Sequence, residues 1–192
     1  MAAKRFRWWH GLAFYAGVQA ASWGLRLAAR NYARQRGVDV ETGDQRFYRS
    51  ERLPLFAPPR IAFPIVWTIN SVSTIAGALH ALNLPMRSPS RNEFLWRQAG
   101  AWMLYSSFQP AYFGLRSPIN AAVVTLFYTA ATYASFKAAV RMRDPLAALS
   151  LVTTLGWLAL ANPVGITQAA WNRDPFWRIG PLINPPANWI KA

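Results

Sequence analysis

Long apolar stretches, separated by short charged turns, dominate the pattern of this chain. The clearest is residues 61–82, which contains no Asp, Glu, Lys or Arg, and in which only His80 can take a proton. About 20 apolar residues, at a rise of about 1.5 Å each, span a hydrocarbon core of about 30 Å. This stretch therefore predicts a transmembrane helix and makes the chain an integral membrane protein.

Four further stretches have a similar length and character, so the pattern predicts an all-α, multi-pass bundle of five transmembrane helices. The five predicted spans are residues 8–29, 61–82, 94–115, 119–140 and 145–171. Short turns follow the third and fourth spans and predict antiparallel hairpins. The basic start of the chain resembles a signal sequence, but its apolar run reaches membrane length and is expected to stay as the first helix. Residues 1–173 are expected to form one transmembrane domain.

Two segments do not fit the helical pattern. The link over residues 30–60 is long, and links of that length are usually functional lids or disordered. Its second half interleaves aromatic residues with prolines, which favours a packed lid. The tail, residues 174–192, carries four prolines and two tryptophans. We expect the tail to lie in the headgroup layer or to dock on another subunit, because its apolar side chains would otherwise be exposed.

Charge narrows the choice of partners. The formal net charge is +14, but the basic residues are spread over every loop instead of forming one face, which argues against nucleic acid. Anionic lipid headgroups are the natural counter-charge. Other membrane protein subunits, or a homodimer, are the predicted protein partners. Both faces of the predicted bundle are basic, so the positive-inside rule gives no orientation. The expected location is a bacterial inner membrane or an organelle membrane.

The chain offers little material for catalysis. It has no cysteine, and no predicted span contains a pair of carboxylates for acid–base work. Neither a phosphate-binding glycine loop nor metal-ligand spacing occurs. We therefore expect a protein that is not an enzyme, with no catalytic and no metal site. His10 and His80 lie near predicted membrane boundaries, where they could be axial ligands of a pigment or simply solvated.

Small residues suggest where helices approach one another. Gly11, Gly17 and Gly24 lie on the first predicted helix, and Gly77 lies on the second. Helices in lipid associate through close packing of this kind. We expect these glycines to mark the packing faces.

The approach to the second span carries a recognisable motif. Aromatic residues and prolines precede the span, and a Trp-Thr pair follows within it: Phe47-Tyr48, Pro54, Phe56, Pro58-Pro59 and Phe63-Pro64-Ile65-Val66-Trp67-Thr68. A second group closes the third span: Phe108, Pro110 and Tyr112-Phe113-Gly114. In this order and spacing the residues resemble the TspO/MBR family, the tryptophan-rich sensory and translocator proteins.

The resemblance implies a five-helix fold that binds a flat apolar ligand inside the bundle, beneath the first loop. The ligand would be a tetrapyrrole such as a porphyrin or chlorophyll-type pigment, a carotenoid or a lipid, although no cofactor is certain. The family's two pocket tryptophans fall on Trp67 and Trp157. The ligand-binding residues expected on this basis are Trp67, Trp157, Phe56, Tyr48, Tyr105 and Phe108. The other interpretation of the two tryptophans is packing or an interfacial belt.

The chain also departs from the family. Phe56 replaces a tryptophan, and Tyr105 and Phe108 stand where the family has asparagine and tryptophan. These changes, together with the tail, favour a second hypothesis: a repurposed accessory subunit of a photosynthetic or respiratory membrane complex. The retained tryptophans favour the first hypothesis, a non-enzymatic ligand-binding protein.

Overall fold

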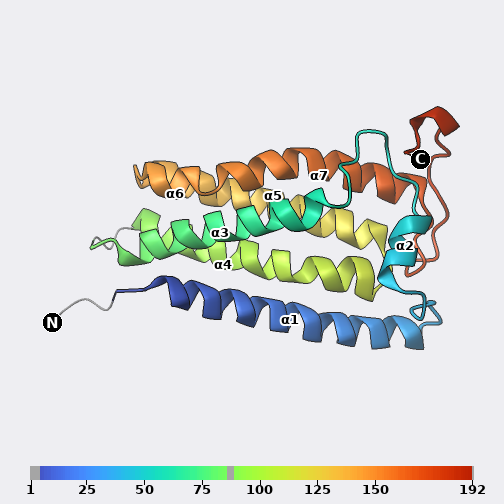
Figure 1. Cartoon of the computed structure of the whole chain (residues 1–192), viewed down its shortest axis with the longest axis horizontal. Coiled ribbons are helices and arrows are strands. Elements are labelled where there is room, and N and C mark those ends of the chain that lie inside the picture. Colours follow the sequence, from blue (N-terminus) through green and yellow to red (C-terminus); the bar gives the residue numbers. More distant parts are fainter. Residues whose placement is uncertain (1–4, 86–88, 192) are drawn as a thin grey trace.

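A computed structural model of the chain describes residues 5–85 and 89–191, and within these ranges the regular structure is helical. Long helices run side by side along the longest axis of the molecule (Figure 1). They are α1 (Trp8–Gln35), α3 (Ala62–Asn83), α4 (Pro89–Gln109), α5 (Pro118–Arg141) and α7 (Val152–Trp171). Shorter elements are α2 (Asp44–Ser50), the π-helix η1 (Pro110–Gly114), α6 (Pro145–Leu149) and the 3₁₀ turn η2 (Ala187–Trp189).

The long helices alternate in direction, so the connections fall at two ends (Figure 1). One end holds the start of α1 and the α5–α6 turn, and we call it the N-terminal end. The opposite end holds α2, the loop that follows it and the C-terminal tail, and we call it the lid end. Apart from two isolated bridges, Pro54 with Ile190 and Asp174 with Ile179, no β-structure occurs in the described ranges.

Three of the long segments are apolar enough to cross a membrane: Ala62–Asn83, Pro118–Arg141 and Pro145–Trp171. They agree closely with three of the predicted spans, in length as well as in composition. The helices α1 and α4 carry more polar and charged residues, and they do not meet the same standard of hydropathy.

The first helix is longer than the predicted span 8–29, because its last turns are anchored at the lid end. Arg26, Arg30 and Arg34 recur every four residues and therefore share one face. Arg26 pairs with Asp44, and Arg30 donates to the carbonyl of Val40. Arg34 pairs with Glu41, its nearer guanidinium nitrogen 2.5 Å from the carboxylate. These contacts attach the last turns of α1 to the lid segment.

The third predicted span, 94–115, is an α-helix that ends in a π-turn. Pro110 has no N–H, so it cannot donate to the carbonyl of Ser106. That carbonyl instead accepts a hydrogen bond from the Ser22 hydroxyl of α1, 2.8 Å away. The π-turn closes with a hydrogen bond that spans five residues, from the Leu115 N–H to the Pro110 carbonyl, at a distance of 2.9 Å. The carbonyl that Pro110 leaves free thus links α4 to α1 by a hydrogen bond.

The fifth predicted span, 145–171, is broken into α6 and α7 at Ser150 and Leu151. The Ser73 hydroxyl of α3 donates to the Ser150 carbonyl at 2.8 Å, which satisfies an acceptor that the break would leave free. A Cβ atom at Gly77 would overlap the Ser150 side chain. Gly77 therefore marks a packing face, directed at α6.

The glycines of α1 do not all behave as expected. A Cβ at Gly11 would meet the Ile75 side chain of α3 at 2.5 Å, so this glycine does mark a helix contact. Gly17 and Gly24 have no such neighbour within 4 Å. The expectation that they lie on a packing face is wrong, because both are on the exposed side of α1.

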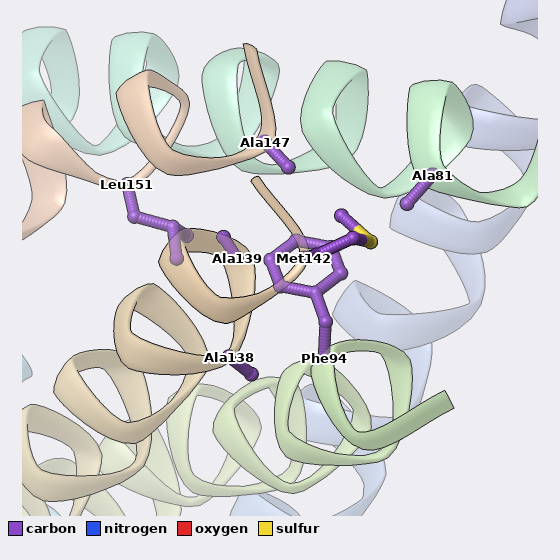
Figure 2. Close-up of a cluster of buried hydrophobic side chains, with 7 residues drawn as sticks. All are labelled: Ala81, Phe94, Ala138, Ala139, Met142, Ala147 and Leu151. Atoms are coloured by element: carbon purple, nitrogen blue, oxygen red, sulfur yellow. The ribbon is translucent and has the colours of Figure 1, made fainter. Parts of the chain in front are cut away.

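A compact hydrophobic cluster closes the N-terminal end. Figure 2 shows it, with Phe94 of α4 pointing toward Met142. Its buried members are Ala81, Phe94, Ala138, Ala139, Met142, Ala147 and Leu151. The alanines let α3, α5 and α6 approach closely, and the three larger side chains fill the space between them. This end is solid.

Candidate ligand-binding cavity

A cavity of about 700 Å³ opens between the helices in the half of the bundle nearer the lid. Helices α1, α3, α4, α5 and α7 all contribute to its wall, and α2 with its following loop contributes the rim. The inner wall is formed by aromatic side chains from four of these helices: Trp67, Tyr105, Tyr128 and Trp157. A volume of this size is in the range of small-molecule sites, about 300–1,000 Å³.

The rings of the inner wall are in mutual contact. The Trp67 centroid lies 5.3 Å from Tyr105, 6.0 Å from Tyr128 and 6.5 Å from Trp157. Steeply inclined arrangements at these distances are favourable for aromatic pairs. Trp157 is only 8% exposed, and its indole nitrogen is covered and has no partner among the described residues. The ring of Trp157, and not its N–H, therefore borders the cavity.

Five of the six expected site residues line this one cavity: Tyr48, Trp67, Tyr105, Phe108 and Trp157. They come from α2, α3, α4 and α7, which are far apart in the sequence. The structure thus brings together residues that the family motif places in three separate segments.

Phe56 is the exception, since it is 52% exposed and does not line the cavity. A turn closed by the Ala57 N–H and the Pro54 carbonyl, 2.9 Å apart, explains its position. The turn buries Leu53 and Ala57 and directs Leu55 and Phe56 outward. The expectation that Phe56 is a ligand contact is therefore not supported by its placement.

Several residues of the cavity were not expected from the sequence. Tyr112 and Gln168 meet at the lid side of the wall, where the Gln168 amide donates to the tyrosine hydroxyl. Tyr128 belongs to the inner wall, and Arg49 and Arg60 stand at the rim. Tyr112 does lie in the motif at the end of the third span. The others occupy helix or loop positions whose direction the pattern does not fix.

A partly buried charge network connects the lid to the bundle. Asp44, at the start of α2, pairs with Arg26 of α1 and with Arg116, whose nitrogen lies 3.1 Å from the carboxylate. Arg116 is 1% exposed, has a left-handed backbone (φ 56°), and lies 4.8 Å from the centre of the Phe47 ring. Burial lowers the pKa of Arg116, and the charge of Asp44 opposes that effect.

A second acidic group lies under the lid. Burial raises the pKa of Glu51 to about 7, while a hydrogen bond with Gln168 lowers it and the charge of Asp174 raises it. Gln168 also lines the cavity, so Glu51 connects the lid to the cavity wall. One carboxylate oxygen of Glu51 is buried without a partner in the part of the chain that the structure describes.

The tail packs in part on its own chain. The Leu55 N–H donates to the Trp189 carbonyl at 3.1 Å, and the Lys191 N–H donates to the Leu53 carbonyl at 2.8 Å. Asp174 is buried and accepts from the Ser117 hydroxyl at 2.6 Å. The sequence predicted a tail docked on another subunit or lying in the headgroup layer. It did not predict these backbone hydrogen bonds between the tail and the lid loop.

The two histidines take no part in the cavity. His80 lies 2.7 Å from Asp144 at the N-terminal end, and the His10 ring contacts the Arg7 backbone. His80 is therefore ion-paired or hydrogen-bonded, and not merely solvated. In the described ranges, no group of three or more His, Cys, Asp or Glu residues could hold a metal ion.

Comparison with known proteins agrees with this architecture. No curated protein matches the chain. A sequence model for the TspO/MBR family matches residues 25–168, which is more than two thirds of the chain and includes every residue of the inner wall. A membrane-helix bundle, a motif at the entrance of α3 and an aromatic cavity beneath the first loop occur together here, and the chain belongs to the TspO/MBR family.

Proposed function

We propose that this protein crosses the membrane five times and binds a flat apolar ligand inside its helix bundle, without catalysing a reaction. The candidates are a tetrapyrrole, a carotenoid or a lipid. The observation that carries the proposal is the aromatic inner wall of the cavity, where the ring centroids of Trp67 and Trp157 lie 6.5 Å apart. Flat faces of this kind favour a ligand that offers an extended π-system or an apolar surface.

Five spans are supported by the arrangement of the two more polar helices. α1 has 28 residues, and α4 with η1 continues over residues 89–114, which is long enough at about 1.5 Å per residue to cross a bilayer core. Large apolar side chains of both helices are exposed, such as Leu12 and Trp23 on α1 and Met103 on α4. Lipid would cover these side chains. Anionic headgroups would meet the basic loops at either end, in a bacterial inner membrane or an organelle membrane.

Porphyrin titration of the purified protein in neutral detergent tests the ligand site. The change in porphyrin absorbance gives the affinity without depending on tryptophan emission. We expect Trp67→Phe and Trp157→Phe each to weaken binding several-fold, because each removes part of an aromatic face worth about 1 kcal/mol. Trp189→Phe is the matched control, since Trp189 is exposed on the tail and does not line the cavity. Equal affinities in all three variants would rule out this cavity as the site.

An accessory role in a larger complex is the weaker hypothesis. It rests on the departures from the family motif and on the apolar tail, and the tail here contacts the lid of its own chain. Leu182 and Ile183 stay exposed beside it and are the positions at which another subunit, or a second copy of the chain, would dock. Co-purification from native membranes, with and without the tail, distinguishes the two roles.

A further inference from the structure

The rim of the cavity carries positive charge that the protein itself does not neutralise. Arg49, Arg60 and Asp44 are its charged residues. Asp44 is already paired with Arg26 and Arg116. Of the described residues, none acidic pairs with Arg49 or Arg60, although Arg60 does lie 5.4 Å from the centre of the Tyr48 ring. Two arginines therefore face the opening with free guanidinium groups.

Both arginines belong to the lid and lie next to Tyr48, Arg49 in the sequence and Arg60 in space. Arg49 follows Tyr48 on α2, and α2 is held by the Asp44 network. Arg60 stacks on Tyr48 from the other end of the lid loop. The Tyr48 ring also lies 6.3 Å from the ring of Phe63, which in turn lies 5.3 Å from Trp157, so a row of aromatic rings leads from Arg60 to the inner wall. A ligand that reaches from the wall to the rim meets aromatic faces first and guanidinium donors last.

We infer that Arg49 and Arg60 form a head-group site for a carboxylate or phosphate, so that the cavity selects an amphipathic anion over a neutral apolar molecule. This inference rests on the proposed ligand-binding function and narrows it. Guanidinium groups match both oxyanions because they offer parallel N–H donors. A carotenoid hydrocarbon has no group for this site. A tetrapyrrole with carboxylate side chains and an anionic phospholipid both have one.

Paired probes separate the head group from the apolar body. The protein in neutral detergent is titrated with a dicarboxylate porphyrin and with its neutral dimethyl ester. We expect the diacid to bind about tenfold more tightly at low salt, which is about threefold for each solvent-exposed arginine. Added salt should reduce the difference. Arg49→Gln/Arg60→Gln should abolish the difference, because the diacid then binds no more tightly than the ester does.

Arg46→Gln is the control, because Arg46 is exposed on the same helix but does not line the cavity. It should preserve the difference between diacid and ester. Equal binding of the two porphyrins to the wild type, or an equal loss in the Arg46 variant, would overturn the head-group site and leave the proposed function standing. Failure of both porphyrins to bind would count against a tetrapyrrole ligand in the proposed function.

Lipid retention identifies the phosphate source and tests the site independently of porphyrin. Native mass spectrometry of the protein with phosphatidylglycerol or uncharged diacylglycerol should show retention of the anionic lipid alone. Retention that is lost in Arg49→Gln/Arg60→Gln and kept in Arg46→Gln supports a phosphate head group. Retention of neither lipid, together with selective binding of the diacid, assigns the site to a carboxylate. Indifference to both probes overturns the inference.

Discussion

Asn172 and the backbone of Arg52 exchange two hydrogen bonds, although 120 positions separate them. The Arg52 N–H donates to the side-chain oxygen Oδ1 of Asn172 at 2.7 Å, and the side-chain Nδ2 of Asn172 donates back to the backbone carbonyl of Arg52 at 2.9 Å. The Asn172 side chain thus pairs with both backbone groups of Arg52, as a neighbouring β-strand would. It fastens the lid to the end of α7.

Removing this side chain should loosen the lid. Asn172→Ala leaves two backbone groups of Arg52 without their partner, which should cost about 1–3 kcal/mol if water cannot replace it. We expect faster hydrogen exchange over residues 51–55 and easier proteolysis of the lid, while the far-UV circular dichroism is unchanged. Asn184→Ala is the control, because Asn184 is exposed and touches only the Arg52 guanidinium at 3.4 Å. Unaltered exchange in the Asn172 variant would show that these bonds do not hold the lid.

The contact between Gly77 and Ser150 should make even a methyl group costly. Gly77→Ala places a Cβ into the Ser150 side chain where α3 meets α6, and overpacking of this kind typically costs about 1–3 kcal/mol. Thermal unfolding in detergent should report the loss. Gly100→Ala, on α4 with no neighbour within 4 Å, should be neutral or stabilising, since alanine is the better helix former. If the two variants unfold at the same temperature, the packing between α3 and α6 is looser than described.

Glu51 should make the stability depend on pH. Its pKa is raised by burial from 4.5 to about 7, so the folded chain holds this proton more firmly than the unfolded chain does. The free energy of unfolding should therefore fall as pH rises from about 4.5 to about 7, and this contribution should level off once Glu51 is deprotonated in both states. Glu51→Gln mimics the protonated form. It should match the wild type near pH 5 and unfold about 2–6 °C higher near pH 8. Glu41→Gln is the control for removing one exposed negative charge, and a similar gain there would contradict the role of burial.

Shortening the tail should open the cavity. Truncation after Asn184 removes the Trp189 carbonyl and the Lys191 N–H, which bind the backbone of Leu55 and Leu53, but it keeps the buried Asp174. We expect faster association and faster release of porphyrin in stopped-flow experiments, with helical content unchanged. Trp189→Phe keeps the backbone bonds and should keep the rates of the wild type. Identical rates in the truncated protein would show that the tail does not restrain the lid.

The helices were predictable because each has a local cause. Lipid-length apolar runs, broken by turns at Arg116–Pro118 and Arg143–Pro145, predicted α3, α5 and the α6–α7 segment to within a few residues. The end of α1 was not predictable in this way. The turns past residue 29 carry Arg30 and Arg34, which contact Val40 and Glu41 of the following loop, and the hydropathy pattern says nothing of such contacts.

The cavity was predictable only as far as the family motif reaches. Trp67 and Trp157 lie on helices whose facing side the motif implied, and both line the cavity. Phe56 lies in an irregular loop, where one turn decides whether a side chain points in or out, and it points out. The rim arginines carried no signal of their own in a chain with 21 Lys and Arg residues.

The cluster of Phe94, Met142 and Leu151 has a consequence for how a ligand travels. These side chains and the alanines around them close the end of the bundle opposite the lid, and none of them borders the cavity. A channel through the bundle would have to open at both ends, whereas this cavity lies in the lid half and does not reach the cluster. Cargo taken up under the lid must leave by the way it came, or sideways between helices. Net movement straight through the bundle, from one face of the membrane to the other, would therefore require this cluster to rearrange.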